Sequence, residues 1–367
     1  MSSDVSTVMI GFGLAGRVFH GPLIEAADGL SLDAIVTSNA DRAAQARELY
    51  PNTVIYSSVE EAWQGGHSLA VVATPNVTHL PHSVAALEHG LHVVLDKPIT
   101  ATAAEAELLA SLSREVGRIV IPYQNRRWDS EFQTICEVAA SGRLGRIHRL
   151  TSQVSKMRII PRDGWRGSSL PEEMGGQLYD LGSHVIDQAI MLLGPVARVF
   201  ATARSIRPGH PADDDSTVIL EHISGAVTTF VVSQVTAFPE PRFTLLGTRG
   251  GLRIDYYDQQ EVTLGAGDYP LPGQAGIDAW DPVEATALLR ESDEDNRVTE
   301  THIPILPGRW PMFYPQVARS ISEGAEPPVL LSDVIANMRV LDAARTSGAT
   351  GVAIELDPPA GHRSQVV

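Results

Sequence analysis

The residues best suited to proton transfer in this sequence are a lysine and an aspartate–histidine pair. Lys97 follows the apolar run His92–Leu95 after one intervening residue, which predicts that it projects from the end of a strand. A lysine there can donate a hydrogen bond to a substrate hydroxyl and stabilise an alkoxide. Asp180 and His184 are four residues apart in a helical pattern, so they share one face. Because histidine titrates near neutral pH, His184 can take a hydroxyl proton and return it.

A glycine-rich turn lies between the first strand pattern and the first helical pattern. Thr7–Ile10 leads into the turn, and the helical pattern begins at Arg17. Glycines allow a tight turn, let the backbone approach a pyrophosphate and let the helix pack closely on the strand, while the helix N-terminus offers N–H groups. This context predicts a dinucleotide-binding turn formed by Gly11, Phe12, Gly13, Leu14, Ala15 and Gly16.

The position expected to meet the adenosine ribose lies about 20 residues further on, at the end of the second strand pattern. Thr37 occupies it, and Ser38, Asn39 and Arg42 follow. Thr37 has no carboxylate that would repel a 2′-phosphate, and the side chains of Ser38, Asn39 and Arg42 can bind one. The sequence therefore favours NADP. NAD stays open, because Arg42 can equally be a solvated helix residue.

A basic run precedes the glycines of the aspartate–histidine segment. Arginines placed over a pocket suit bidentate binding of carboxylate, sulfonate or phosphate, although most such runs are solvated loops. The hypothesis is a sugar or polyol substrate that carries an anionic group. The candidate substrate-binding residues of this run are Lys156, Arg158, Arg162, Trp165 and Arg166.

Two kinds of pattern divide the chain near residue 125. Before it, short β-branched runs alternate with amphipathic helical patterns such as Asp41–Leu49 and Ala103–Val116, which predicts a doubly wound parallel sheet. After it, strand patterns joined by Gly and Pro turns predict an open, mainly antiparallel sheet with helices on one face, including one at Leu178–Leu193. The predicted class is α/β, with a Rossmann domain at 1–125, a substrate-binding α+β domain at 126–356 and a flexible tail at 357–367.

One segment interrupts the strand patterns of the second domain. Gly265–His302 is rich in glycine, proline and acidic residues, with an acidic run at Glu291–Asp295. We expect a surface excursion there, with a short helix at Val283–Leu289. Beyond it, Ser332–Thr346 has a clear helical pattern with cap residues at its start.

Composition and charge exclude several kinds of partner. The 367 residues include 44 acidic and 28 basic side chains, and the formal charge of −16 repels nucleic acid and anionic membranes. No apolar stretch approaches the roughly 18 residues that span a bilayer, and no signal peptide is recognisable, so we expect a cytoplasmic protein. Cys136 is the only cysteine, which excludes an intramolecular disulfide. The histidine spacings lack an accompanying carboxylate triad, so we expect no metal.

Three further motifs, in order along the chain, resemble those of the glucose-fructose oxidoreductase/inositol dehydrogenase family. They are Val71–His79 (VVATPNVTH), Val93–Pro98 (VVLDKP) and Gly175–Asp187 (GGQLYDLGSHVID). Gly11–His20 (GFGLAGRVFH) and Gln124–Asp129 (QNRRWD) are similar to the branch that contains NADP-dependent scyllo-inositol dehydrogenases. The similarity extends over nearly the whole chain.

The resemblance implies a Rossmann domain followed by a domain whose sheet mediates homodimer or homotetramer contacts. It implies that Lys97 acts at the reacting oxygen and that Asp180 and His184 lie on the substrate side. The residues that it places near NAD or NADP are Thr74, Pro75, Asn76, His79, Asp96, Lys97, Pro98 and Gln124. The usual Glu-Lys-Pro reads Asp96-Lys97-Pro98 here, and the shorter acid is expected to alter contacts to the ribose while leaving Lys97 in place.

Three functions fit these residues. The first is oxidation or reduction of a sugar, inositol or related polyol with NAD(P). The second, implied by some relatives, is an NAD-dependent glycoside hydrolase such as a sulfoquinovosidase, which oxidises the sugar transiently, eliminates the aglycone, adds water and reduces the product. Tyr123 or Tyr179, on the substrate side, would supply its further acid or base. The third is a cofactor-sensing regulator, against which the retention of Lys97, Asp180 and His184 argues. The sequence leaves the first two open.

Overall fold

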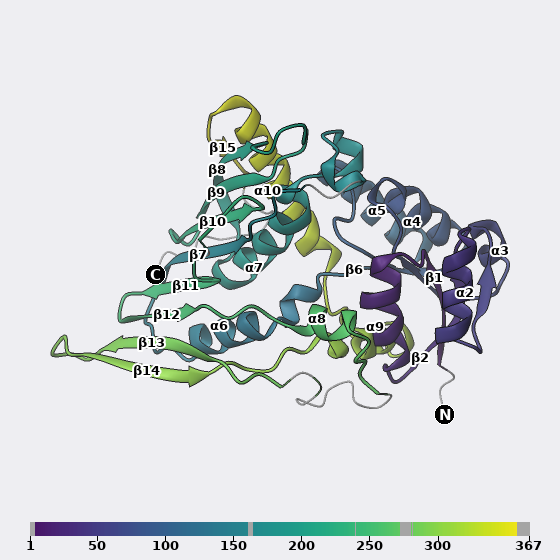
Figure 1. Ribbon diagram of the computed structural model, residues 1–367, viewed down its shortest axis with the longest axis horizontal. Coiled ribbons are helices and arrows are strands. Elements are labelled where there is room, and N and C mark those ends of the chain that lie inside the picture. Colours follow the sequence, from purple (N-terminus) through teal and green to yellow (C-terminus); the bar gives the residue numbers. More distant parts are fainter. Residues whose placement is uncertain (1–3, 161–163, 239, 272–279, 281, 358–367) are drawn as a thin grey trace. The chain divides into compact units, whose positions relative to one another are not determined.

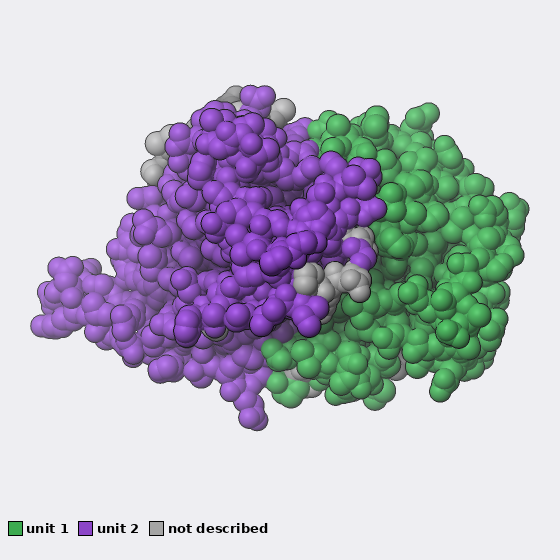
Figure 2. Space-filling view, turned by 45° about the horizontal axis from the view of Figure 1, so that its top comes forward, with its two compact units in different colours: residues 1–125, 259–282, 309–334 green, residues 126–258, 283–308, 335–367 purple. Residues whose placement is uncertain are grey.

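A computed structural model describes residues 4–160, 164–238, 240–271, 280 and 282–357 (Figure 1). The chain divides into two compact units (Figure 2). Unit 1 consists of residues 1–125, 259–282 and 309–334, and unit 2 of residues 126–258, 283–308 and 335–367. The sequence pattern had placed both later segments of unit 1 in the second domain.

Unit 1 is built on a six-stranded parallel sheet. Its strand order is β3-β2-β1-β4-β5-β6, which reverses direction between β1 and β4. The strands are β1 (Val5–Ile10), β2 (Leu30–Val36), β3 (Val54–Tyr56), β4 (Leu69–Val72), β5 (His92–Leu95) and β6 (Val120–Pro122). Ligands of doubly wound sheets bind beyond the carboxyl ends of the strands at such a reversal. The predicted doubly wound sheet is confirmed, and the short β3 is a strand that the sequence pattern missed.

Helices connect the parallel strands of unit 1. They are α1 (Gly21–Glu25), α2 (Ala40–Leu49), α3 (Val59–Trp63), α4 (His79–Glu88) and α5 (Ala103–Val116). The two later segments add α8 (Gln260–Gly265) and α9 (Phe313–Ser322). Because α9 packs against β1 and β2, residues 309–334 belong to unit 1 although they follow the second sheet in the sequence.

Unit 2 is built on a nine-stranded sheet in the order β14-β13-β12-β11-β7-β10-β9-β8-β15. Neighbouring strands are antiparallel except β7 and β10, which run parallel. The first strands are β7 (Ile147–Ser155), β8 (Val196–Arg204), β9 (Asp215–His222), β10 (Val227–Ser233), β11 (Phe243–Gly247) and β12 (Gly250–Ile254). The helices α6 (Ser130–Ala140) and α7 (Ser183–Leu193) pack against β12, β7 and each other. The predicted, mainly antiparallel second sheet is confirmed.

The segment after residue 282 differs from the prediction. β13 (Thr286–Ser292) and β14 (Val298–Pro304) form an antiparallel hairpin at the sheet edge, so the helix predicted at Val283–Leu289 is wrong (Figure 1). Ala287 and Leu289 are buried while their neighbours are more exposed, which is the two-residue period of a strand. The acidic run begins at the end of β13 and continues into the turn, where the Asp293 carboxylate accepts from the amides of Asp295 and Arg297.

The described chain ends on a long helix and a short strand. α10 (Leu331–Thr350) includes the predicted helix Ser332–Thr346 and extends past it, and β15 (Ile354–Glu355) pairs with β8. Residues 358–367 of the predicted tail lie outside the described residues. Among the helices that the structure describes, none is long and apolar enough to cross a membrane.

Candidate active site

The glycine turn after β1 depends on two close backbone approaches. Gly11 has a φ of +98°, and a Cβ there would lie 2.6 Å from the carbonyl oxygen of Ala73, which follows β4. A Cβ on Gly16 would lie 2.3 Å from the carbonyl oxygen of Gly11. Real side chains do not tolerate such distances from backbone atoms. Packing within unit 1 therefore requires glycine at both positions.

Gly13, between them, has open space instead. The one atom within 4 Å of a Cβ placed there is Nη1 of Arg42, at 3.9 Å. The helical turn η1 (Ala15–His20) begins here, where the Arg17 amide donates to the Gly13 carbonyl at 3.0 Å, and the earlier amides of a helix start remain available to a ligand. Open space beside a glycine backbone at the β1–β4 reversal fits a pyrophosphate.

The other two residues of the turn differ in exposure. Phe12 is buried and its ring meets the ring of Tyr50 edge to face at 6.1 Å, whereas Leu14 is exposed. Phe12 therefore anchors the turn in the core of unit 1.

The predicted adenosine residues surround the start of α2. Asn39 caps this helix by accepting a hydrogen bond from the Arg42 amide at 2.9 Å, and the Thr37 hydroxyl accepts from the Asn39 amide at 3.4 Å. Ser38 and Arg42 are exposed. The 3.9 Å distance between Nη1 of Arg42 and the Cβ position of Gly13 brings the guanidinium beside the glycine turn. Arg42 therefore borders the space in which the turn would hold a dinucleotide.

The turn after β4 is tied to the turn after β5 by a histidine. His79 is fully buried; its Nδ1 lies 2.8 Å from the carbonyl oxygen of Pro98 and its Nε2 lies 3.0 Å from that of Thr74. Burial lowers the pKa of His79, opposed by Asp96 and by the two carbonyls. Asn76, in the same turn as Pro75, is also buried. The motif residues 74–79 thus fix the backbone on which Lys97 is carried.

Lys97 comes two residues after the end of β5, as its sequence position predicted. The Asp96 Oδ1 atom accepts a hydrogen bond from the Lys97 amide at 2.8 Å, and the Lys97–Pro98 peptide is cis. Burial raises the pKa of Asp96, but His20, His79 and Lys97 together outweigh it and hold the pKa below its usual value. Asp96 is therefore an ionised carboxylate that orients the lysine turn.

Tyr123 and Gln124 follow β6 and are both buried. The Tyr123 hydroxyl donates to the carbonyl oxygen of Phe19 at 2.9 Å. This hydroxyl therefore helps to hold η1 in unit 1.

Asp180 and His184 lie on one continuous helical segment, as predicted. Its first turn, η6 (Leu178–Gly182), is π-helical, and α7 continues it. The His184 side chain is buried, and Oδ2 of Asp180 lies 3.5 Å from Nε of Arg166. The Tyr179 ring packs under the Arg345 guanidinium at 4.9 Å. The structure thus joins Arg166 to the predicted acid.

The rest of the basic run has varied surroundings. Lys156 is exposed, and the carbonyl oxygen of Arg158 accepts from Nη1 of Arg207 at 3.1 Å. Arg162 lies outside the described residues, as does the side chain of Trp165. No common anion pocket follows from the residues that are described.

Buried polar contacts hold α7 in place. Nε and Nη2 of Arg127 donate to the two oxygens of the Asp187 carboxylate, each at 2.8 Å. Gln188 donates to the carbonyl oxygen of Arg126 at 2.9 Å and accepts from Arg242 at 3.0 Å. Asp187 and Gln188 follow His184 by three and four positions. Their contacts therefore set the rotation of the helix that carries His184. Asp187 therefore anchors the helix.

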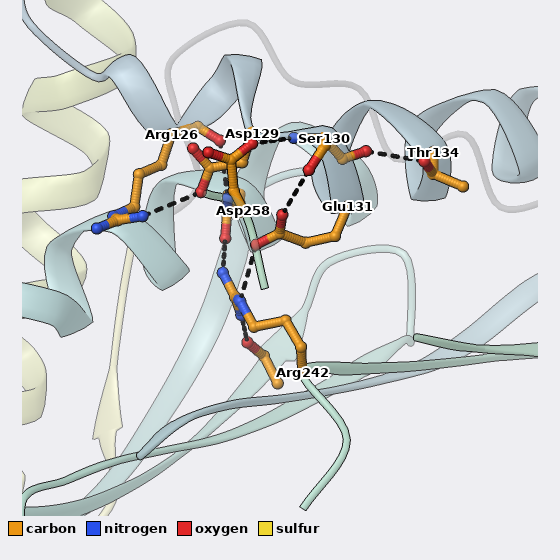
Figure 3. Close-up of polar contacts among 9 residues, drawn as sticks. Arg126, Asp129, Ser130, Glu131, Thr134, Arg242 and Asp258 are labelled. Carbon is orange, nitrogen blue, oxygen red and sulfur yellow. Dashed lines mark hydrogen bonds and ion pairs between the residues drawn. The ribbon is translucent and has the colours of Figure 1, made fainter. Parts of the chain in front are cut away.

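Arg242 is the centre of a wider buried cluster (Figure 3). Its Nε lies 3.2 Å from Oε1 of Glu131, and its Nη1 donates to the Ser152 hydroxyl at 2.6 Å. Burial raises the pKa of Glu131, although Arg242 opposes the shift. Two further contacts in the cluster join Ser130 to Asp258 and Arg126 to Asp129. Arg126 and Asp129 belong to the Gln124–Asp129 motif. No motif marked Glu131, Arg242 or Asp258, since their partners lie far away in the sequence.

Gln234 is a polar residue that the sequence analysis missed. It follows β10, is only 6% exposed, and donates to the Oε1 atom of Gln177 at 2.7 Å. Its own Oε1 is buried with no hydrogen-bond partner among the described residues, and its backbone carbonyl accepts from the Arg158 amide at 2.8 Å. The amide thus lies where β10, the basic run and the start of the Asp180 helix meet. The only signal in the sequence was a glutamine just after a strand pattern.

Comparison with known proteins identifies two family models in the chain. Residues 5–124 match the model described as "Oxidoreductase family, NAD-binding Rossmann fold", and residues 132–253 match the "GFO/IDH/MocA C-terminal domain". Together the two matches include most strands of both sheets. The motifs of the glycine turn, the lysine turn and the aspartate–histidine helix all lie within them.

Three similar proteins align with nearly all of the chain. It is 34% identical to scyllo-inositol 2-dehydrogenase (NADP(+)) IolW of Bacillus subtilis, over 92% of each chain. It is 32% identical to the oxidoreductase YdgJ of Escherichia coli, over 93% of this chain and 96% of the other. The solved structure of the Bacillus subtilis protein yvaA has a TM-score of 0.88 at 29% identity, and the alignment covers 97% of this chain and 100% of that one.

Proposed function

Because the chain belongs to the GFO/IDH/MocA oxidoreductase family, whose Rossmann domain binds an NAD-type cofactor, we propose that it oxidises a secondary hydroxyl of a sugar, inositol or related polyol, or reduces the corresponding ketone. The observation that carries the proposal is the position of Lys97. It leaves β5 at the carboxyl edge of the sheet, two strands from the glycine turn, on a backbone fixed by Asp96 and His79. A cation held there suits an oxygen whose carbon exchanges a hydride.

Each site residue has a defined task in this reaction. Bound NAD or NADP supplies the hydride acceptor or donor. Lys97 donates a hydrogen bond to the substrate oxygen and stabilises negative charge on it. His184 takes the hydroxyl proton in the oxidation and returns it in the reduction. Asp180, paired with Arg166, binds a second hydroxyl, and the buried Gln234 Oε1 accepts a hydrogen bond from a third.

We infer that NADP is the preferred cofactor. Thr37 leaves the adenosine end without a carboxylate at that position, and Arg42 brings a guanidinium beside the glycine turn. The similarity to an NADP-dependent relative supports the same choice. Fluorescence titration of the purified protein with NADPH and with NADH measures the preference, and tighter binding of NADH would refute it.

A neutral polyol is the substrate class that the contacts support best. Arg166 lies against Asp180, so its charge is already balanced by a carboxylate. The other candidates in the basic run for binding an anionic group on the substrate are Lys156, Arg158 and Arg162. Single alanine variants of these three residues test the anionic alternative: we expect KM to stay within about twofold of wild type, and a rise of about tenfold or more would establish an anionic substrate.

We further propose that copies of the chain associate through the sheet of unit 2. Support comes from Phe200, an aromatic residue of β8 that stays 39% exposed in the described chain. Light scattering of the purified protein is expected to show a dimer or tetramer, and Phe200→Asp is expected to weaken it. A monomer at micromolar concentration would refute the proposal.

A paired assay tests the reaction itself. Purified protein is offered inositols, free sugars and nitrophenyl glycosides, and both nicotinamide absorbance and aglycone release are followed. We expect stoichiometric formation of NAD(P)H that disappears in Lys97→Ala and His184→Ala, while both variants still bind NADPH. Aglycone release without net cofactor change would instead identify a redox-neutral glycosidase.

A further inference from the structure

His20 is a buried histidine that the proposed reaction does not use. It is the last residue of η1, and its side chain is 0% exposed. Its Nδ1 lies 2.6 Å from the hydroxyl oxygen of Tyr314, and its Nε2 lies 3.7 Å from Oδ2 of Asp96. The ring packs on Tyr123, with the centroids 4.3 Å apart. His20 therefore stands between a tyrosine of α9 and the carboxylate that precedes Lys97.

The chemistry of the Tyr314 hydroxyl and the imidazole determines which nitrogen of His20 carries a proton. Burial raises the pKa of Tyr314 well above its usual value, so its hydroxyl keeps its proton and can donate to Nδ1 of His20. A neutral imidazole that accepts at Nδ1 carries its proton on Nε2, the atom that faces Asp96. Nε2 has no hydrogen-bond partner within the described residues; at 3.7 Å its contact with Oδ2 of Asp96 is electrostatic.

Asp96 has a donor facing each of its two carboxylate oxygens. Oδ1 accepts from the Lys97 amide at 2.8 Å, and Oδ2 faces Nε2 of His20. The carboxylate is 17% exposed, so it connects the buried histidine to the edge of the sheet from which Lys97 projects. His79 and Lys97 also face it and add positive potential. These contacts therefore fix the orientation of the Asp96 carboxylate and favour its ionised form.

His222 is a buried histidine with a purely structural role, and it serves as a comparison for His20. His222 is also buried, with Nδ1 2.7 Å from the carbonyl oxygen of Gly194 and Nε2 2.8 Å from the Thr228 hydroxyl. Both of its ring nitrogens have close neutral partners. His20 differs, because one nitrogen faces a carboxylate beside the lysine of the proposed site.

We propose that Tyr314 and His20 form a positioning relay that fixes the Asp96 carboxylate and, through the Lys97 amide, the turn that presents the Lys97 amine. The relay explains a role for the segment 309–334 in unit 1, since α9 supplies Tyr314. Neither His20 nor Tyr314 touches the reacting atoms in this scheme. The relay deepens the proposed function and rests on the role of Lys97 in it.

Kinetics of three variants of the full chain test the relay. In Tyr314→Phe we expect kcat to fall about tenfold, and in His20→Gln up to about a hundredfold, because small misplacement of a catalytic group has effects of this size. KM and the Kd for NADPH should stay within about twofold, since the binding contacts remain. The control His222→Gln should lower Tm while leaving kcat within about twofold. Unchanged kcat in both relay variants would overturn the proposal.

A second readout does not depend on turnover. In protein labelled with ¹⁵N-histidine, the His20 signals, assigned with His20→Gln, should show a proton on Nε2, and they should shift in Asp96→Asn and in Tyr314→Phe. The relay would be refuted if His20 carried its proton on Nδ1 alone, or if its signals had the same chemical shifts in both variants as in the wild type. Either result would refute it even if the enzyme is active. Conversely, turnover that survives in Lys97→Ala would refute the proposed function. The ¹⁵N spectra would then still test whether His20 contacts Tyr314 and Asp96.

Discussion

The turn that carries Lys97 and the helix that carries His184 are positioned by different kinds of contact. Apart from the proposed relay, the lysine turn depends on contacts that are close in the sequence: Asp96 binds the next amide, and His79 reaches a carbonyl 19 residues away. The helix of His184 depends on distant segments, since Arg127 binds Asp187 60 residues away and Arg242 binds Gln188 54 residues away. A motif can encode the first kind of contact but not the second.

The largest effect is expected when a contact between segments far apart in the sequence is removed. In Arg242→Met, Glu131 loses its buried partner, and we expect the free energy of unfolding to fall by about 3–5 kcal/mol. The measurement is urea denaturation followed by fluorescence. The control is Arg290→Met, whose pair with Glu300 is exposed on both sides and should change stability by about 1 kcal/mol or less. Equal losses in the two variants would contradict the comparison.

The same contrast explains what the sequence could predict. The glycine turn, the strand before Lys97 and the helix of Asp180 were predictable because each depends on residue types at short fixed spacings. The partners of Arg242, the return of α9 to unit 1 and the role of His20 depend on contacts that only the fold creates. The hairpin β13–β14 was missed for another reason, since its buried alternation covers few residues beside an acidic turn.

Variants of two glycines test the contacts within the turn after β1. A methyl group on Gly16 meets the Gly11 carbonyl, so Gly16→Ala should lower the free energy of unfolding by about 1–3 kcal/mol. Gly13→Ala has room for its methyl group and should leave Tm nearly unchanged, yet the methyl would fill the space proposed for the pyrophosphate and weaken NADPH binding. Thermal unfolding and NADPH titration of both variants separate the effects. NADPH bound normally by Gly13→Ala would show that the ligand does not use this space.

A smaller effect is expected at the adenosine end of unit 1. Arg42→Ala removes one charged donor from the glycine turn, which should raise the Kd for NADPH about tenfold and leave that for NADH unchanged. Arg47→Ala, an exposed arginine on the same helix, is the matched control and should change neither constant. Similar losses for both cofactors in Arg42→Ala would mean that the arginine does not read the 2′-phosphate.

The smallest effect concerns acid stability within unit 1. His92 accepts a hydrogen bond from the Ile119 amide at 3.1 Å, and burial together with Arg118 lowers its pKa to about 4. An unfolded histidine has a pKa of about 6.5, so the unfolded chain takes up this proton first as the pH falls. The contribution of His92 to stability is therefore complete above about pH 6.5 and declines toward pH 4.

Urea denaturation at pH 7.5 and pH 5 measures this decline. The wild type should lose more stability between the two values than His92→Gln does, because the variant lacks that proton uptake. The difference is expected to be modest, since His92 is only partly buried. An identical loss in both proteins would mean that groups other than His92 set the acid sensitivity, and would remove this local contact from the comparison.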